Sequence, residues 1–306
     1  MIRYWKRYSI VAVVVVTTVL AVWAQGPQLR RHVVIAKRPL DLITATQPPP
    51  SENQVSIEIH EGHRHVTANG IPDHQVGRFP NSTNPHSIRP QQYRIDLPAT
   101  PKPADRITSI YFSDRRGPPN MPFGITVTGV LMDPGTAEFW NADRQAGWNY
   151  EALSGAVPLG IDENMAHVQP NGAYHYHGLP RPLLKRLGLA PGGHSPQIGW
   201  GADGFPVYAV HGYGDPKKAE SAVIELKSSF RLKVGNRPDG EAGPGGKYDG
   251  TFVQDYEFTQ GAGDLDECNG RFCVTPEFPD GTYAYFLTND WPVIPRSFRG
   301  TPVNLR

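Results

Sequence analysis

Glycine and proline recur so often along this chain that long regular elements are not expected. The 306 residues include 32 glycines and 31 prolines, and both residue types favour tight turns and disfavour the interior of a helix. Their abundance predicts many short elements joined by turns. The chain is long enough to bury a hydrophobic core in one large domain or two small ones.

Alternation of apolar and polar residues predicts several of these elements as strands. In the segment 55–59, Val55 and Ile57 alternate with Ser56 and Glu58, which is the period of a half-buried strand. Further strands are expected at 63–68, 93–97, 125–132, 174–177, 205–210, 230–234, 253–258 and 282–287, and short helices at 136–153 and 183–187. We therefore predict a β-rich fold, mainly antiparallel β with minor helices, arranged as a sandwich or a distorted barrel in a single domain.

The segment 1–24 has the pattern of an export signal. Positively charged Arg3, Lys6 and Arg7 precede an apolar run at 10–24. As a helix this run would rise by about 22 Å, which is shorter than the roughly 30 Å hydrocarbon core of a membrane. This length favours a signal peptide, and an uncleaved membrane anchor is the alternative interpretation.

The composition changes after the apolar run. Residues 25–54 contain scattered basic residues, few apolar ones and three consecutive prolines at 48–50, which predicts a flexible linker. The globular domain is expected at 55–306, in the periplasm or secreted. We expect contact with the membrane only through the N-terminal segment, and the sequence does not indicate which protein partners the domain has.

The charge balance gives no support for a nucleic-acid partner. The sequence has 30 Lys and Arg against 29 Asp and Glu, whereas nucleic-acid binding requires a basic face. We therefore expect no nucleic acid among the partners.

The two cysteines, Cys268 and Cys273, lie close together in the part of the chain predicted to be exported. An oxidising compartment and the turn-forming Asn269 and Gly270 between them predict a disulfide. A pair of free thiols used for redox chemistry or copper binding is the alternative.

A histidine-rich segment is the strongest candidate site. Alternate residues of a strand point to the same face, so His175 and His177 are expected on one face and the tyrosines of 174–177 on the other. A chain reversal at 170–172 would bring His167 beside this pair. Three imidazoles are a common ligand set for copper or zinc, although a polar strand face or two core histidines are alternative interpretations.

A second group of histidines lies earlier in the sequence. His60, His63 and His65 occupy the first predicted hairpin, and His74 follows shortly after. A solvated turn is one interpretation and a supplementary metal site is the other.

The motif at 174–177, Tyr-His-Tyr-His, resembles the YHYH domain family, which is named for it. Four further segments are similar to the same family, namely 69–74, 133–136, 198–206 and 265–271. The resemblance extends from about residue 55 to the C-terminus. It implies a protein that is often exported, and it implies no particular activity, ligand or catalytic residue. The stretch 172–177 is also similar to the copper-binding strands of multicopper oxidases, although the cysteine and methionine ligands of cupredoxins are not evident.

Three hypotheses for function follow. The first is an envelope protein that binds a divalent transition metal through His167, His175 and His177. The second is a metal-dependent hydrolase or lyase outside the cytoplasm, in which the metal activates water and Asp203 or Glu163 acts as the base. The third is a non-catalytic interaction domain with structural histidines. Whether the protein is an enzyme stays open at this point.

Overall fold

The structure, a computed structural model, describes residues 37–111 and 120–306. The predicted signal peptide or anchor at 1–24 and the first part of the predicted linker lie outside the described residues. No helix within the described ranges is long and apolar enough to cross a membrane.

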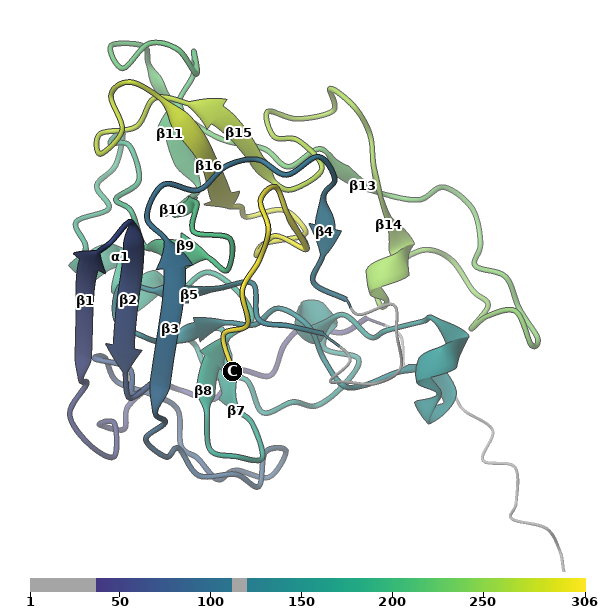
Figure 1. Ribbon diagram of the computed structural model, residues 1–306. Helices are drawn as coiled ribbons and strands as arrows, with labels where there is room; N and C mark the ends of the chain where they lie inside the picture. Colours follow the sequence, from purple (N-terminus) through teal and green to yellow (C-terminus); the bar gives the residue numbers. More distant parts are fainter. Residues whose placement is uncertain (1–36, 112–119) are drawn as a thin grey trace, which may run out of the picture. The chain divides into compact units, whose positions relative to one another are not determined.

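An eight-stranded mixed sheet forms the largest element (Figure 1). Its strands, in spatial order, are β15 (Gly270–Cys273), β16 (Thr282–Leu287), β10 (Pro206–Ala209), β9 (Gly199–Gly201), β5 (Gly124–Thr126), β6 (Leu131–Met132), β8 (Tyr174–Tyr176) and β7 (Ala166–Val168). Neighbouring strands are antiparallel except for the parallel pairs β10–β16 and β6–β8. The sheet is open, with β15 and β7 at its edges.

A three-stranded antiparallel sheet contains β1 (Val55–His60), β2 (His63–Ala68) and β3 (Tyr93–Pro98). The turn between β1 and β2 uses Glu61 and Gly62, which have φ values of 50° and 78°, as a two-residue hairpin requires. Along β2, exposed and buried side chains alternate. The guanidinium of Arg64, on the buried face, lies 4.4 Å above the ring of Trp200 in β9, so the inner face of this sheet packs against the large sheet.

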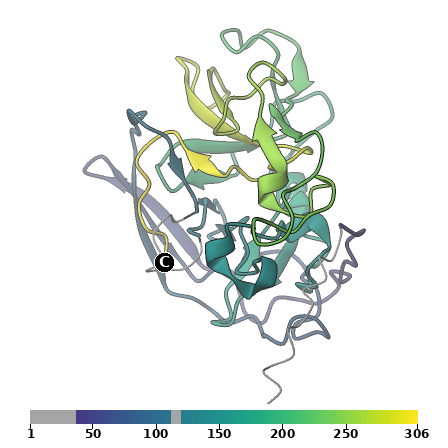
Figure 2. The ribbon, with the colours of Figure 1, turned by 90° about the vertical axis from the view of Figure 1, so that its right-hand side faces the viewer.

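The remaining elements are short. Two-stranded sheets pair β11 (His211–Tyr213) with β12 (Val223–Glu225), β13 (Phe230–Leu232) with β14 (Tyr256–Phe258), and β4 (Thr108–Ser109) with β17 (Ser297–Phe298). The described helices are α1 (Arg181–Arg186) and the 3-10 helices η1 (Trp140–Ala142), η2 (Arg144–Ala146), η3 (Ala152–Ser154) and η4 (Val253–Asp255). Tyr150, just before η3, forms a β-bridge with Phe252, just before η4, so the segments that contain η3 and η4 lie side by side (Figure 2).

The prediction of a β-rich, mainly antiparallel fold with minor helices is confirmed, and the described strands form no closed barrel. The expected helix at 136–153 is replaced by three 3-10 turns. Asn141 and Ala142 have positive φ values of 59° and 53°, and Gly147 has 73°, so a continuous α-helix is interrupted. Part of the predicted linker packs on the domain, since the backbone NH of Arg38 donates to Ser154 and that of Gln47 to Val76.

The predicted disulfide is wrong, because Cys268 and Cys273 are both free and buried. Cys268 packs in the main hydrophobic core, and Cys273 belongs to a separate cluster with Tyr208 and Phe286. Cys273 is the last residue of the extended strand β15, whereas Cys268 precedes this strand. Burial raises the pKa of both thiols, which disfavours the thiolate that redox chemistry or copper binding requires.

Candidate metal centre

The pairing of β7 with β8 assembles the predicted histidines. His167 lies directly opposite His175 in the antiparallel register, and His177 follows on the same face of β8. The chain reverses at 169–172, where the NH of Gly172 donates to Gln169, and the NH of His177 donates to the carbonyl of Met165. The reversal predicted from Asn171 and Gly172 therefore brings all three imidazoles together.

The three rings form one compact cluster, which we call the buried triad. Their centroids are 4.6 to 4.7 Å apart, and one nitrogen from each ring lies within 4.8 Å of the other two. The Nε2 atoms of His175 and His177 are 3.0 Å apart. Two nitrogens that each lie about 2.0–2.1 Å from a shared tetrahedral ion would be about 3.3 Å apart. The pair is therefore close to the spacing that a metal ion imposes.

Backbone carbonyls orient two of these rings. Nδ1 of His167 donates to Leu159 at 2.9 Å, and Nδ1 of His175 donates to Ala173 at 3.2 Å. Because Nδ1 carries the proton, Nε2 presents a lone pair, which is the usual arrangement of a metal-binding histidine and its supporting carbonyl. Nδ1 of His177 is buried without a hydrogen bond among the described residues, although the carbonyl of Pro134 interacts with this ring.

Burial keeps the triad uncharged. It lowers the pKa of His167 and of His175 to about 3, and the neighbouring His175 lowers that of His167 further. The pKa of His177 lies well below its usual value, through burial first and then through His167 and His175. Neutral imidazoles are the form that binds a metal. The hydrogen bond between Nε2 of His175 and Nε2 of His177 places a proton on one of these two atoms, and a bound ion would displace it.

The triad opens on a cavity of about 480 Å³. The cavity wall also includes Asp133, whose Oδ2 accepts from Nε2 of Gln169 at 2.8 Å and forms an ion pair with Arg306. The other oxygen, Oδ1, is buried and accepts no hydrogen bond from any described residue. Burial raises the pKa of Asp133, against the opposing effect of Arg306. The cavity therefore combines three neutral imidazoles with an acidic group that has an unused acceptor.

Comparison with known proteins identifies the family. A family model described as "YHYH protein" matches residues 94–300, which is more than half of the chain. The chain belongs to this family. The match includes the buried triad but begins after β1 and β2, so it is shorter than the span expected from the sequence. No curated protein and no solved structure matches the chain.

The tyrosines of the YHYH motif lie on the opposite face of β8, as predicted, and both are fully buried. The hydroxyl of Tyr174 donates to Asp162 at 2.8 Å and accepts from Asn164 at 3.1 Å. The hydroxyl of Tyr176 donates to Nε2 of His74 at 2.7 Å, since Nδ1 of His74 donates to a backbone carbonyl. The tyrosines thus fix the strand that carries the histidines. His74 serves this face and is not part of the hairpin cluster suggested by the sequence.

Neither base suggested by the sequence lines the cavity of this YHYH protein. Asp203 is buried elsewhere and accepts from the hydroxyl of Tyr285 at 2.5 Å and from the NH of Gly300 at 2.8 Å. Glu163 is exposed and accepts from the NH of Ala45 at 2.9 Å. Asp133 lines the cavity, but the sequence did not lead us to predict it as a candidate base. The segment 133–136 carries part of the family resemblance, which was the available signal.

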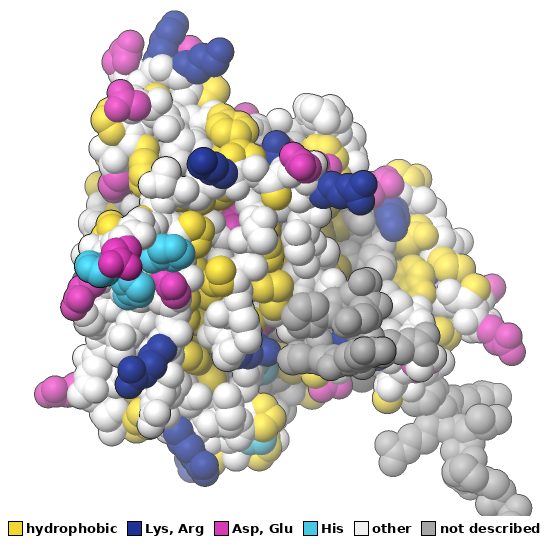
Figure 3. All heavy atoms as spheres, in the orientation of Figure 1, with side chains coloured by type: hydrophobic (Ala, Val, Ile, Leu, Met, Phe, Trp, Pro, Cys, Tyr) yellow, Lys and Arg dark blue, Asp and Glu magenta, His cyan; other side chains and the backbone are white. Residues whose placement is uncertain are grey.

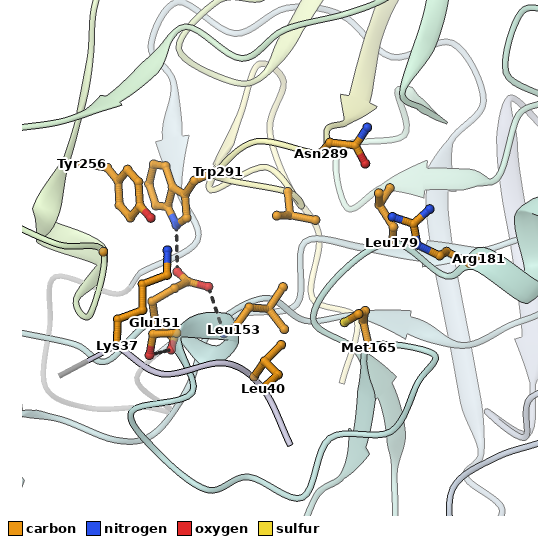
Figure 4. Close-up of a pocket in the computed structure, with 13 residues that line it drawn as sticks. Lys37, Leu40, Glu151, Leu153, Met165, Leu179, Arg181, Tyr256, Asn289 and Trp291 are labelled. Atoms are coloured by element: carbon orange, nitrogen blue, oxygen red, sulfur yellow. Dashed lines mark hydrogen bonds between the residues drawn. The ribbon is translucent and has the colours of Figure 1, made fainter. Parts of the chain in front are cut away.

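A second, smaller cavity of about 290 Å³ contains no member of the triad in its wall (Figure 4). Tyr256 and Trp291 stack at its edge, with ring centroids 4.2 Å apart. Glu151 accepts from Nε1 of Trp291 at 2.9 Å and forms a buried ion pair with Arg296. The polar groups of Glu151 are therefore already satisfied within the fold, and the triad is the better candidate site.

Proposed function

We propose that this YHYH protein binds one divalent transition-metal ion, zinc or copper, through His167, His175 and His177. The observation that carries the proposal is the convergence of three neutral imidazoles, two of them with Nδ1 held by backbone carbonyls. Nitrogen ligands favour zinc and copper over magnesium and calcium. Purely structural histidines would not require one nitrogen from each of three rings to lie within 4.8 Å of the others beside a cavity.

Metal titration of protein without a histidine tag tests the proposal. We expect the wild type to bind Zn²⁺ tightly at one buried site, and we expect the double variant His175→Ala, His177→Ala to lose that site. His194→Ala is the matched control, because this histidine lies outside the cavity wall. Unchanged tight binding in the double variant would contradict the proposal, as would a wild type without tight binding.

Metal-dependent hydrolysis or lyase activity is a second candidate, favoured by the adjoining cavity. Three protein ligands leave a coordination position free for water, as in catalytic zinc sites. Asp133 lines the same cavity and has an unpaired Oδ1, which makes it a candidate base. Turnover of an ester or phosphoester panel by the zinc-loaded protein, lost in Asp133→Asn with metal binding retained, would support this function. Absence of turnover in the loaded wild type would favour binding alone.

We also propose that the domain works outside the cytoplasm, in the periplasm or secreted. The basic start and the apolar run at 10–24 support this location. A reporter that is active only in the cytoplasm, fused after Arg306, should be silent. An active reporter would contradict export.

A further inference from the structure

A second group of histidines and carboxylates lies on the outer face of the three-stranded sheet. Strand register places Glu58 of β1, His65 of β2 and Asp96 of β3 in one cross-strand row. His60 and His63 face each other in the next row. Directly opposed residues of neighbouring strands have Cβ atoms about 4.5–5.5 Å apart. The sheet therefore presents three imidazoles and two carboxylates within a small exposed area (Figure 3).

One carboxylate oxygen already links two of these imidazoles. Oδ1 of Asp96 lies 3.1 Å from Nδ1 of His63 and 3.5 Å from Nδ1 of His65. Nitrogen and oxygen ligands at about 2.0–2.2 Å from a shared tetrahedral ion would be roughly 3.3–3.5 Å apart. Both imidazoles are thus at ligand spacing from the carboxylate. Their ring centroids are 6.3 Å apart, and these three groups do not converge as the buried triad does, so the exposed side chains would have to rotate to bind one ion together.

From this arrangement we propose that His63, His65 and Asp96 bind a second divalent transition-metal ion, with His60 and Glu58 beside it as further ligands. Two imidazoles and one carboxylate form a mixed nitrogen and oxygen set that suits zinc, copper or nickel. The site belongs to a rigid frame, because β2 is paired on both sides. It is separate from the buried triad, since β1, β2 and β3 form a different sheet from β7 and β8.

The exposure of its side chains determines how strongly this second site binds a metal ion. The side chains of His63, His65 and Asp96 are 51%, 48% and 57% exposed, so an ion reaches them from solvent without opening the fold. Free side chains lose rotamer entropy when they converge on an ion, whereas the rings of the buried triad are already packed. We infer weaker, readily exchanged binding at the exposed site.

Zn²⁺ titration by calorimetry in two backgrounds tests the inference. In the His175→Ala, His177→Ala background, one weaker site should remain, and adding His63→Ala with His65→Ala should weaken it by about 100-fold, because two of three ligands are lost. Thr67→Ala, on the adjacent row of the same face, is the matched control and should leave binding unchanged. Asp96→Glu should retain more affinity than Asp96→Ala.

If the variant His175→Ala, His177→Ala fails to fold, the same substitutions can be tested in the wild-type background. There, His63→Ala with His65→Ala should remove the weaker of two binding steps while circular dichroism stays unchanged. Persistence of the weaker step would overturn the inference, as would a wild type with a single step that these variants leave intact. A single step that is lost with His63 and His65 would support the exposed site and contradict the buried one.

Discussion

The molecule carries two His-x-His strands whose surroundings differ completely. His175 lies on β8, inside the large sheet, His177 follows directly after this strand, and both are almost fully buried. His63 and His65 lie on β2, in a sheet whose outer face meets solvent. Period-two geometry puts each pair on one face of its strand, and each pair has a further imidazole opposite it, His167 for the buried pair and His60 for the exposed pair. The buried pair converges with His167 in front of a cavity, whereas the exposed pair faces solvent.

The motif therefore sets the direction of the side chains, and the tertiary fold sets their chemistry. On β8 the opposite face is held by Tyr174 and Tyr176, which donate to Asp162 and His74. On β2 the opposite face is held by Arg64, stacked on Trp200. Both strands are therefore fixed from behind, and burial of the front face is what distinguishes them.

The largest expected effect is acid destabilisation of the metal-free protein by the buried triad. Burial lowers the pKa of His167 and His175 to about 3, whereas an unfolded imidazole has a pKa near 6.5. The unfolded chain binds protons that the folded chain cannot, so stability is complete above about pH 6.5 and falls as the pH drops toward 3. The two residues should cost on the order of 5 kcal/mol at about pH 4.5.

Urea unfolding between about pH 7.5 and 4.5 measures this loss. The variant His167→Gln with His175→Gln should show a flatter profile, because glutamine does not titrate. A wild-type free energy of unfolding that stays constant over this range would show that the rings are not held in their neutral form.

Single histidine substitutions should distinguish the two histidine clusters by their effect on the tight metal site. His167→Ala removes one of three buried ligands and should weaken the tight metal site by about 100-fold, at the upper end of the cost of losing a supporting partner. His63→Ala should leave that tight site unchanged, because the exposed cluster lies on another sheet. Competition titration with a zinc-binding dye measures both, and equal effects of the two variants would contradict the distinction.

Substitution of Asp133 should have an intermediate effect. Asp133→Asn removes a buried negative charge beside the triad and weakens the contact with Arg306. We expect zinc affinity to fall by about tenfold, as for partners behind metal ligands. Gln169→Ala, which removes only the donor to Asp133, is the milder control. Unchanged zinc affinity in Asp133→Asn would show that this carboxylate does not affect metal binding.

The tyrosines should matter least for metal binding. Tyr174→Phe removes a donor to Asp162 and an acceptor for Asn164, so it should cost about 1–3 kcal/mol of stability. Zinc affinity should change by less than about threefold, because the hydroxyl lies on the opposite face of the strand. Calorimetry alongside urea unfolding separates these two quantities. A large loss of affinity without a loss of stability would mean that the motif acts through its tyrosines.

Local features of the site could be predicted from the sequence, whereas contacts between residues far apart in the chain could not. Strand period and the turn at 170–172 were sufficient to bring His167 beside His175 and His177. Asp133 and Arg306 are far apart in the sequence but form an ion pair, and no local pattern specifies such a contact. The disulfide failed for a related reason, since short separation in sequence did not reveal that β15 is extended between two packed clusters.

The central claim is that the buried triad binds a metal ion, and anomalous diffraction tests it most directly. Crystals of tag-free protein grown with Zn²⁺ would be measured on both sides of the zinc absorption edge. We predict an anomalous peak about 2.0–2.1 Å from Nε2 of His167, His175 and His177. Absence of a peak there, with the Nε2 atoms of His175 and His177 still about 3.0 Å apart and zinc bound elsewhere on the protein, would contradict it.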